Sequence, residues 1–416
     1  MHRIQSLSAA VIGQVEAGKT LTEALSAALG RPPALTPQQR GAIQDICYGT
    51  MRHLAELRLV LRELVPQALP VPAIEHLLLA ALYQLYYSRA ASHAVVNHAV
   101  SLAGHEARGR FKGLVNATLR NALRRREALM AAVERDDEAR CNHPRWWLDM
   151  LRAVWPDAWL DIVAADNAHP PLTLRINPRR SDMAAVLKRL KEAGIEATAL
   201  DEQALLLASP RPVADLPGFA EGWFSVQDWG AQQAARRLDL TDGLRVLDAC
   251  AAPGGKTCHM LELAELDLTA VDVDAHRLVR VQENLDRLGL QANLLAADAV
   301  RPDTWWDGRP FDRILADVPC SATGVVRRNP DIRWLRRPGD FSALAAQQAA
   351  MLDALWSLLA SGGKMLYATC SIHPEENSRQ IDAFLQRQAD ACCLHQEQLL
   401  PAERHDGFYY ALLEKH

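Results

Sequence analysis

Apolar residues recur at every third or fourth position along residues 1–140, which is the pattern of amphipathic helices. The stretch from Met1 to Leu29 mixes charged and apolar residues, so it predicts such a helix and not a secretory signal. Thr36 and Pro37 are typical of a helix N-cap followed by proline in the first turn. A strongly apolar helix is predicted over residues 74–87. We therefore predict an all-helical bundle over residues 1–140.

The pattern changes over residues 141–229. A tryptophan-rich helical stretch comes first, and a small α+β module follows it. The module is predicted to contain a strand at 172–176, a helix at 182–193 ended by Gly194, and short strands at 196–200 and 205–208.

Strand and helix patterns alternate over residues 230–416. The predicted strands are 245–249, 268–273, 293–296, 313–317 and 364–369, with helices between them. Such alternation is typical of a mostly parallel sheet covered by helices on both faces. The predicted fold class is thus α/β and Rossmann-like, preceded by the all-α domain and the small α+β module.

The composition is that of an ordinary globular protein. The 416 residues are 49% hydrophobic and 23% charged, and no apolar run reaches the roughly 18 residues of a membrane span. The eight cysteines form no CxxC pair, so we expect no structural zinc or other metal. We expect a cytoplasmic monomer that does not associate with membranes.

The net charge of −4 argues against extensive coating of nucleic acid, but basic clusters occur locally. A solvated helix face is the simpler interpretation of any one cluster. Several clusters flank the segments that carry the candidate chemistry, which favours phosphate contacts. The candidate contacts to nucleic-acid phosphates are Arg175, Arg327, Arg328 and Arg333.

A glycine turn joins the strand at 245–249 to a helix, at the strand edge where doubly wound folds bind ligands. Asp248, Asp272 and Asp298 each stand at the end of a predicted strand, where a carboxylate can bind a ribose or an adenine amine. Cys250 stands where a phosphate-binding P-loop needs glycine, and the GxGxxG of nicotinamide sites is absent. A nucleoside without phosphates fits, and S-adenosylmethionine is one.

Two cysteines, Cys320 and Cys370, follow the last two predicted strands and should lie beside that site. A lone cysteine is usually a small buried hydrophobe, but two at neighbouring strand ends suggest chemistry. A thiolate added to carbon 6 of a cytosine makes carbon 5 nucleophilic enough to take a methyl group. Asp317 stands where it can reach the N3 edge of the base. The chemistry alone leaves open which cysteine attacks.

Five segments carry a family resemblance: DACAAPGGKT (248–257), DVPCSATGV (317–325), RRNPDIRW (327–334), YATCS (367–371) and PEEN (374–377). With them the chain resembles the RNA cytosine-5 methyltransferases. In combination with the helical N-terminal domain and the closing segment GFYYALL (407–413), it resembles in particular the bacterial B-type enzymes that act on 16S ribosomal RNA. Residues 1–140 resemble the RNA-binding fold of the antitermination factor NusB. Val318 departs from the alanine that is commoner in the family, which we expect to be neutral.

The resemblance implies a role for each matching residue. Cys370 is the expected nucleophile, Cys320 is expected to assist release of the product, and Lys256 is expected to face the reaction centre. The implied binding residues for S-adenosylmethionine are Ala249, Cys250, Ala251, Ala252, Pro253, Gly254, Gly255, Asp272, Asp298 and Asp317. The implied substrate is one cytidine of small-subunit ribosomal RNA. The same chemistry on transfer RNA is an alternative, as is an RNA-binding assembly or antitermination factor with an inactive methyltransferase domain.

Overall fold

The computed structural model describes residues 2–30 and 32–416. It divides into two compact units, which are described separately. The helical unit comprises Met1–His169 and Val326–Arg336, and the catalytic unit comprises Pro170–Val325 and Arg337–His416. Residues 141–169, which the sequence pattern grouped with the α+β module, thus belong to the helical unit. The same holds for residues 326–336, although they follow the strand that carries Asp317.

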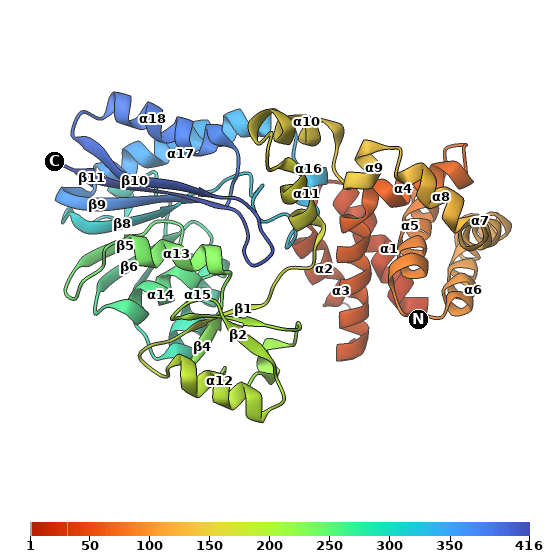
Figure 1. The fold of residues 1–416 in the computed structure, drawn as a ribbon, viewed down its shortest axis with the longest axis horizontal. Helices are drawn as coiled ribbons and strands as arrows, with labels where there is room; N and C mark the ends of the chain where they lie inside the picture. Colours follow the sequence, from red (N-terminus) through yellow and green to blue (C-terminus); the bar gives the residue numbers. More distant parts are fainter. Residues whose placement is uncertain (1, 31) are drawn as a thin grey trace. The chain divides into compact units, whose positions relative to one another are not determined.

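The helical unit is built around α5, whose side chains at Ile74, Leu78 and Leu82 are completely buried. Helices α1, α3, α4, α6 and α7 pack against it. The helices of this unit are α1 (His2–Glu16), α2 (Leu21–Leu29), α3 (Pro37–Arg52), α4 (Leu54–Leu64), α5 (Pro72–Tyr87), α6 (Ser92–Ala103), α7 (Lys112–Arg124), α8 (Arg126–Val133), α9 (Asp137–Cys141), α10 (Arg145–Val154), α11 (Trp159–Asn167) and α16 (Ile332–Leu335), as Figure 1 shows. The predicted all-helical domain is confirmed.

The N-terminal segment differs from the prediction in one respect. The single helix expected over Met1 to Leu29 is two helices, and Met1 itself lies outside the described residues. Gly18 has a φ of +102°, which ends α1, and Thr20 then caps α2 through a reciprocal capping box with Glu23. The predicted cap at Thr36 is confirmed, because its side chain accepts a hydrogen bond from the backbone of Gln39.

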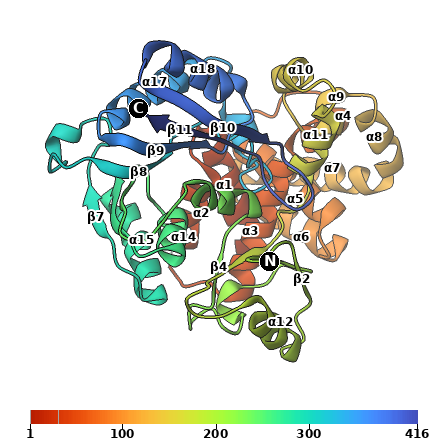
Figure 2. The same cartoon turned by 60° about the vertical axis from the view of Figure 1, so that its left-hand side comes forward.

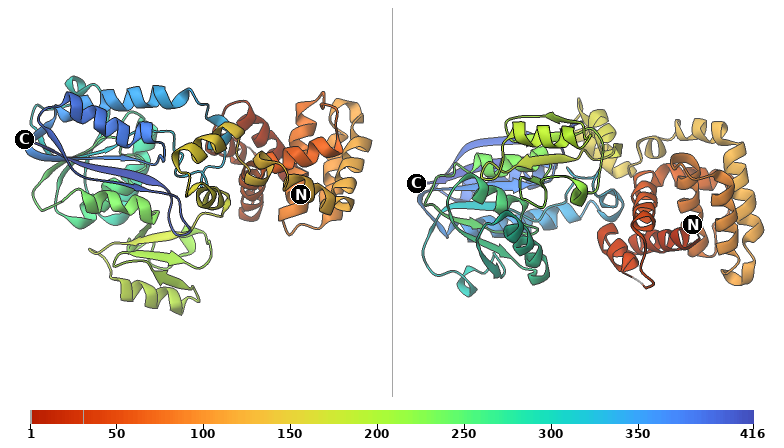
Figure 3. Two further views of the ribbon diagram at one scale, coloured as in Figure 1. Left: turned by 45° about the horizontal axis from the view of Figure 1, so that its top comes forward. Right: turned by 90° about the horizontal axis from the view of Figure 1, so that it is seen from below.

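The small α+β module opens the catalytic unit. Its strands are β1 (Thr173–Ile176), β2 (Ala197–Ala199), β3 (Ala204–Leu207) and β4 (Phe224–Val226), and its helix is α12 (Met183–Glu192). The strands form a sheet in the order β2-β3-β1-β4, with α12 covering one face (Figure 3). The three predicted strands and the helix are confirmed, whereas the three-residue β4 was not predicted.

A seven-stranded sheet forms the rest of the catalytic unit, in the order β10-β11-β9-β8-β5-β6-β7. The five predicted strands are confirmed as its parallel part: β5 (Arg245–Asp248), β6 (Asp267–Asp272), β7 (Asn293–Ala296), β8 (Phe311–Asp317) and β9 (Leu359–Thr369). The antiparallel strands β10 (Ala391–Leu399) and β11 (Phe408–Lys415) extend it and were not predicted.

Helices cover both faces of this sheet (Figure 2). On one face lie α13 (Trp229–Arg237), α14 (Gly255–Leu263) and α15 (Ala275–Leu288), and on the other α17 (Asp340–Trp356) and α18 (Ser378–Arg387). Met260 and Val281 fill the core between the sheet and helices α13–α15. Leu352 and Phe384 fill the core between the sheet and helices α17 and α18. The predicted Rossmann-like architecture is therefore confirmed. Among the helices described, none is long and apolar enough to span a membrane.

Candidate active site

The parallel strands end at one edge of the sheet, and the predicted site residues stand on the loops that leave it. The loop 249–255 connects β5 to α14 and turns at Gly254, whose φ is +95°. A Cβ on Gly254 would lie 3.0 Å from the Cα of Val281, so helix α15 approaches the turn too closely for any side chain. Asp272, at the end of β6, accepts a hydrogen bond from the backbone of Ala252 at 3.0 Å and fixes the turn from the other side.

Asp248 is the most deeply buried of the three aspartates predicted at the strand ends. Its Oδ2 accepts a hydrogen bond from the hydroxyl of Thr257 at 2.7 Å, while its Oδ1 has no partner among the described residues. Burial raises the pKa of Asp248 to about 7. A buried polar atom without a partner at a ligand-binding edge indicates a place for a ligand group.

The other predicted cofactor residues differ in exposure. Asp298 is exposed at the end of β7, and its Oδ1 accepts a hydrogen bond from the backbone of Val300. Cys250 is partly buried, and burial raises the pKa of its thiol, so it acts as a small apolar residue. Val318 is buried and donates its N–H to the carbonyl of Ala368, so the β-branched residue continues the β8–β9 ladder.

Lys256 and Asp317 form an ion pair over the same edge, with 2.5 Å between Nζ and Oδ2. Burial alone would lower the pKa of Lys256, but the neighbouring Asp317 carboxylate raises it above the ordinary value. The ammonium group therefore stays charged. Both side chains remain partly exposed, Lys256 to 13% and Asp317 to 28%, so each can still meet a substrate.

The two cysteines lie side by side, with 3.4 Å between Cys320 Sγ and Cys370 Sγ. Their loops are held by backbone contacts: Gly324 N donates to Cys370 O at 2.8 Å, and Gly407 N donates to Gly324 O at 2.7 Å. A Cβ on Gly324 would lie 2.3 Å from the carbonyl oxygen of Gly407, so only glycine fits there. The hydrogen bond with Cys370, together with burial, raises the pKa of Cys320 well above its ordinary value. Cys320 is thus a protonated thiol at neutral pH.

Three of the four arginines predicted to bind RNA are buried, so this part of the prediction is wrong. Arg175, Arg327 and Arg333 are 0%, 1% and 0% exposed, respectively, which leaves no guanidinium surface for phosphates. Arg175 instead forms a bidentate ion pair with Glu262, at 2.7 and 2.8 Å, and donates to the carbonyl of Gly255 in the cofactor loop. Arg328 alone of the four is partly exposed.

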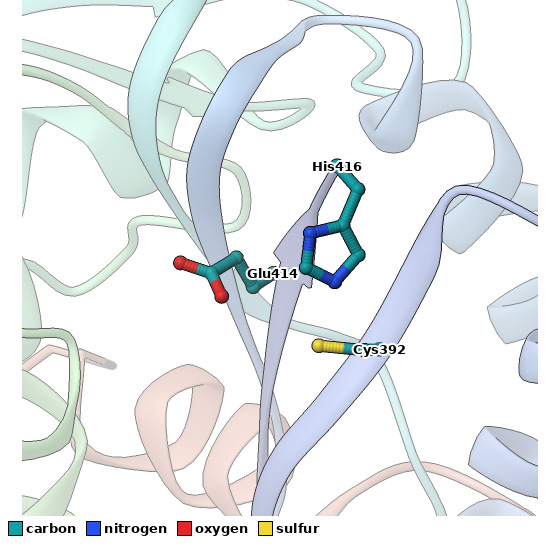
Figure 4. A group of neighbouring side chains, drawn as sticks. All are labelled: Cys392, Glu414 and His416. Carbon is teal, nitrogen blue, oxygen red and sulfur yellow. The ribbon is translucent and has the colours of Figure 1, made fainter.

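The described residues also contain a small group with ligand atoms for a metal, formed by Cys392, Glu414 and His416 (Figure 4). Their candidate ligand atoms lie within 4.8 Å of one another. Glu414 pairs across β11 and β9 with Lys364, whereas Tyr409 pairs with Thr369, the residue before Cys370. The group therefore lies at the opposite edge of the sheet from the cysteine pair and takes no part in that site.

Comparison with known proteins gives three family matches along the chain. Residues 235–414 match the family "16S rRNA methyltransferase RsmB/F", residues 143–214 match its ferredoxin-like domain, and residues 2–124 match the NusB family. The predicted NusB-like domain is thereby confirmed.

Individual relatives cover nearly the whole chain. Ribosomal RNA small subunit methyltransferase B of Pseudomonas syringae is 48% identical over 91% of this chain and 90% of its own length. The protein of the same name from Vibrio cholerae is 44% identical over 99% of this chain and 97% of its own length. The solved structure of a methyltransferase homolog protein from Pyrococcus horikoshii is 25% identical, with a TM-score of 0.60, over 67% of this chain and 97% of its own.

The Rossmann-like sheet and the family match over residues 235–414 together define an S-adenosylmethionine-dependent methyltransferase. The NusB-like and ferredoxin-like domains narrow this class of methyltransferases to one family, because both accompany the methyltransferase domain in this chain. The chain belongs to the family of ribosomal RNA small subunit methyltransferase B.

Proposed function

We propose that this chain methylates carbon 5 of one cytidine in 16S ribosomal RNA through a covalent adduct with Cys370. The observation that carries the proposal is the pair of sulfur atoms 3.4 Å apart, on loops at the strand edge where we propose that the cofactor binds. One sulfur can bond to the base while the other stays free for a second task. Two cysteines with a purely structural role would have no reason to stand together at the ligand-binding ends of the strands.

The cofactor residues fit S-adenosylmethionine, which supplies an electrophilic methyl group when bound. Gly254 lets the loop turn tightly against α15, which places the loop backbone at the strand ends. Each carboxylate oxygen has two lone pairs, so Asp272 can accept a ribose hydroxyl besides its contact with Ala252. The unpaired Oδ1 of Asp248 can accept from an amino group. We assign the adenine amine to Asp298.

The proposed reaction begins when the Cys370 thiolate adds to carbon 6 of the cytosine. The electron pair of the carbon 5–carbon 6 double bond shifts towards N3, where Asp317 and Lys256 hold the developing charge or proton. Carbon 5 then takes the methyl group that bound S-adenosylmethionine would supply, and the sulfur–methyl bond of the donor would break as the new carbon–carbon bond forms. Cys320 gives its proton to the Cys370 sulfur as the carbon 6–sulfur bond breaks, and the resulting Cys320 thiolate takes the carbon 5 proton, which re-forms the carbon 5–carbon 6 double bond. We assign Cys320 to this release step.

The two cysteines are predicted to behave differently when replaced. Cys370→Ala should abolish methyl transfer, because no nucleophile remains. Cys320→Ala should accumulate an RNA–protein adduct, because release is blocked after attack. A denaturing gel with small-subunit RNA and S-adenosylmethionine measures both. Cys392→Ala, at the opposite edge of the sheet, is the control and should leave turnover unchanged. An adduct with Cys370→Ala and none with Cys320→Ala would reverse the assignment.

Labelled-methyl transfer to RNA from cells tests the substrate. Label in 16S ribosomal RNA, mapped to one 5-methylcytidine that is missing in cells without the protein, is the expected result. Label in transfer RNA would move the same chemistry to another substrate. No label in any fraction would leave an RNA-binding protein with an inactive methyltransferase domain.

A further inference from the structure

The chain turns back beneath the cysteine pair directly after Cys370. A short helical turn, η4 (Pro374–Glu376), brings Glu376 under both cysteine loops. The Glu376 side chain is completely buried, and no basic group of the described residues forms an ion pair with it. A buried carboxylate without a cation is costly unless neutral donors satisfy it.

Four neutral donors satisfy this carboxylate. Oε1 accepts from the backbone of Ser321 at 2.8 Å and from the amide of Gln348, on α17, at 3.0 Å. Oε2 accepts from the hydroxyl of Ser321 at 2.5 Å and from the hydroxyl of Ser371 at 2.6 Å. Ser321 follows Cys320 and Ser371 follows Cys370, so one carboxylate holds the residue after each thiol.

Further contacts make this carboxylate the centre of a rigid network. Tyr367, on β9, donates its hydroxyl to the carbonyl of Glu376 at 2.6 Å. Gln348 donates to the carbonyl of Pro319 at 2.9 Å, which holds the residue before Cys320. Movement of one cysteine loop would thus break hydrogen bonds to the other.

We propose that Glu376 is a positioning residue for the reaction: it locks the two cysteine loops together and so holds the two thiols in place. This inference rests on the proposed cysteine chemistry. The carboxylate lies too deep to touch the substrate, so it acts through the two thiols. Effective covalent catalysis depends on such placement, since a displacement of about 1 Å can cost about 100-fold in rate.

Electrostatics points the same way as the geometry. The hydrogen bond with Cys370 and burial raise the pKa of Cys320, and the negative charge of Glu376 raises it further. The titratable groups that interact with one or other thiol are Lys256 on α14, Tyr367 on β9, Glu376 on η4 and Tyr410 on β11. Only Glu376 among them is hydrogen-bonded to the loops of both cysteines.

The test compares Glu376→Gln with Glu375→Gln in the full-length protein. Glu375 is the adjacent carboxylate, is 44% exposed and contacts Arg379, so its replacement is a matched control. Glu376→Gln should lower kcat about 100-fold with little change in KM for RNA. It should also move the alkylation of Cys320 by iodoacetamide, followed by mass spectrometry, to lower pH. Glu375→Gln should match the wild type in both measurements.

Ser371→Ala provides a second, milder variant in case Glu376→Gln does not fold. It removes one hydroxyl but keeps the charge, so kcat should fall while the pH profile of Cys320 stays near that of the wild type. An unchanged kcat in this variant would overturn the proposal. So would a folded Glu376→Gln protein with a lower melting temperature but wild-type kcat and alkylation profile. Alkylation needs no RNA, so it tests Glu376 even if the wild-type protein transfers no methyl group.

Discussion

At the scale of single residues, a buried carboxyl group at the end of β5 lowers the stability of the fold at neutral pH. Asp248 is 1% exposed and has one hydrogen-bond donor, Thr257. Burial raises the pKa of Asp248 to about 7, above the value of about 3.9 for an unfolded carboxyl group. Between these two pKa values the folded state binds more protons than the unfolded state. Stability therefore falls as the pH rises from about 4 to about 7.

Asp248→Asn should remove this pH-dependent loss, because an amide has nearly the same shape and no charge to desolvate. We expect the melting temperature of the variant, relative to the wild type, to be higher at pH 8 than at pH 4.5. Differential scanning calorimetry at the two pH values measures it. Asp298→Asn, at the exposed strand end, should show no such dependence. An equal effect of Asp248→Asn at both pH values would mean that the carboxyl group is not protonated in the fold.

At the scale of helices and strands, the parallel core was predictable and its extension was not. Strands β5, β6 and β8 are short apolar runs, and each ends in an aspartate that marks its carboxyl end. Strand β10 reads ACCLHQEQL, and every one of its side chains is partly buried or exposed, so its periodicity is weak. It exists because it pairs with β11, which itself pairs with β9. Pairing between distant segments leaves no local pattern to read.

The lack of a local pattern also explains why the sequence does not reveal that Arg175, Arg327 and Arg333 are buried. Arg175 and Glu262 are separated by 87 positions, so no local pattern shows that the two residues form a buried pair. In the structure, the ion pair of Arg175 with Glu262 links β1 to α14. Arg175 also donates a hydrogen bond to the carbonyl of Gly255, at the end of the loop 249–255. The small α+β module thus supports the loop that we propose binds the cofactor.

Arg175→Met should lower the free energy of unfolding by about 3–5 kcal/mol, because it leaves the buried Glu262 charge without a partner. Urea denaturation measures the loss. The control is Arg189→Met on α12, whose ion pair with Glu221 is about half exposed and should contribute less than about 1 kcal/mol. Replacing Arg175 and Glu262 together by Met and Leu should cost less than Arg175→Met alone. A larger loss in the double variant would contradict the buried-charge explanation.

At the scale of the whole molecule, the chain leaves the catalytic unit after Val325, passes through the helical unit and returns at Arg337. Within the helical unit this segment is firmly held. Asp331 accepts from the backbone of Leu21 at 2.8 Å, and Trp334 donates to the carbonyl of Met51 at 2.7 Å. The RRNPDIRW motif is therefore a structural part of the helical unit as well as a neighbour of the cysteine loop in sequence.

Arg333 is the deepest anchor of that segment and carries the last prediction. It donates to the carbonyls of Asn142 and Asp166 and to the side chain of Asn167, all at 2.7–2.9 Å. Burial lowers the pKa of Arg333 to about 10, which still leaves it charged at neutral pH. Arg333→Met should cost about 1–3 kcal/mol for each buried acceptor left unpaired. Amide hydrogen exchange should therefore accelerate across α9–α11.

The control is Arg145→Met on α10, whose side chain is 63% exposed and pairs with Asp149. It should leave exchange unchanged. Binding of S-adenosylmethionine, measured by calorimetry, should survive in Arg333→Met, because the cofactor residues belong to the other unit. If Arg333 contacted RNA instead, the variant would lose RNA affinity while its amide exchange stayed at the wild-type rate. The burial of its guanidinium group argues for the first outcome, since a side chain with no exposed surface cannot release counterions from a phosphate backbone.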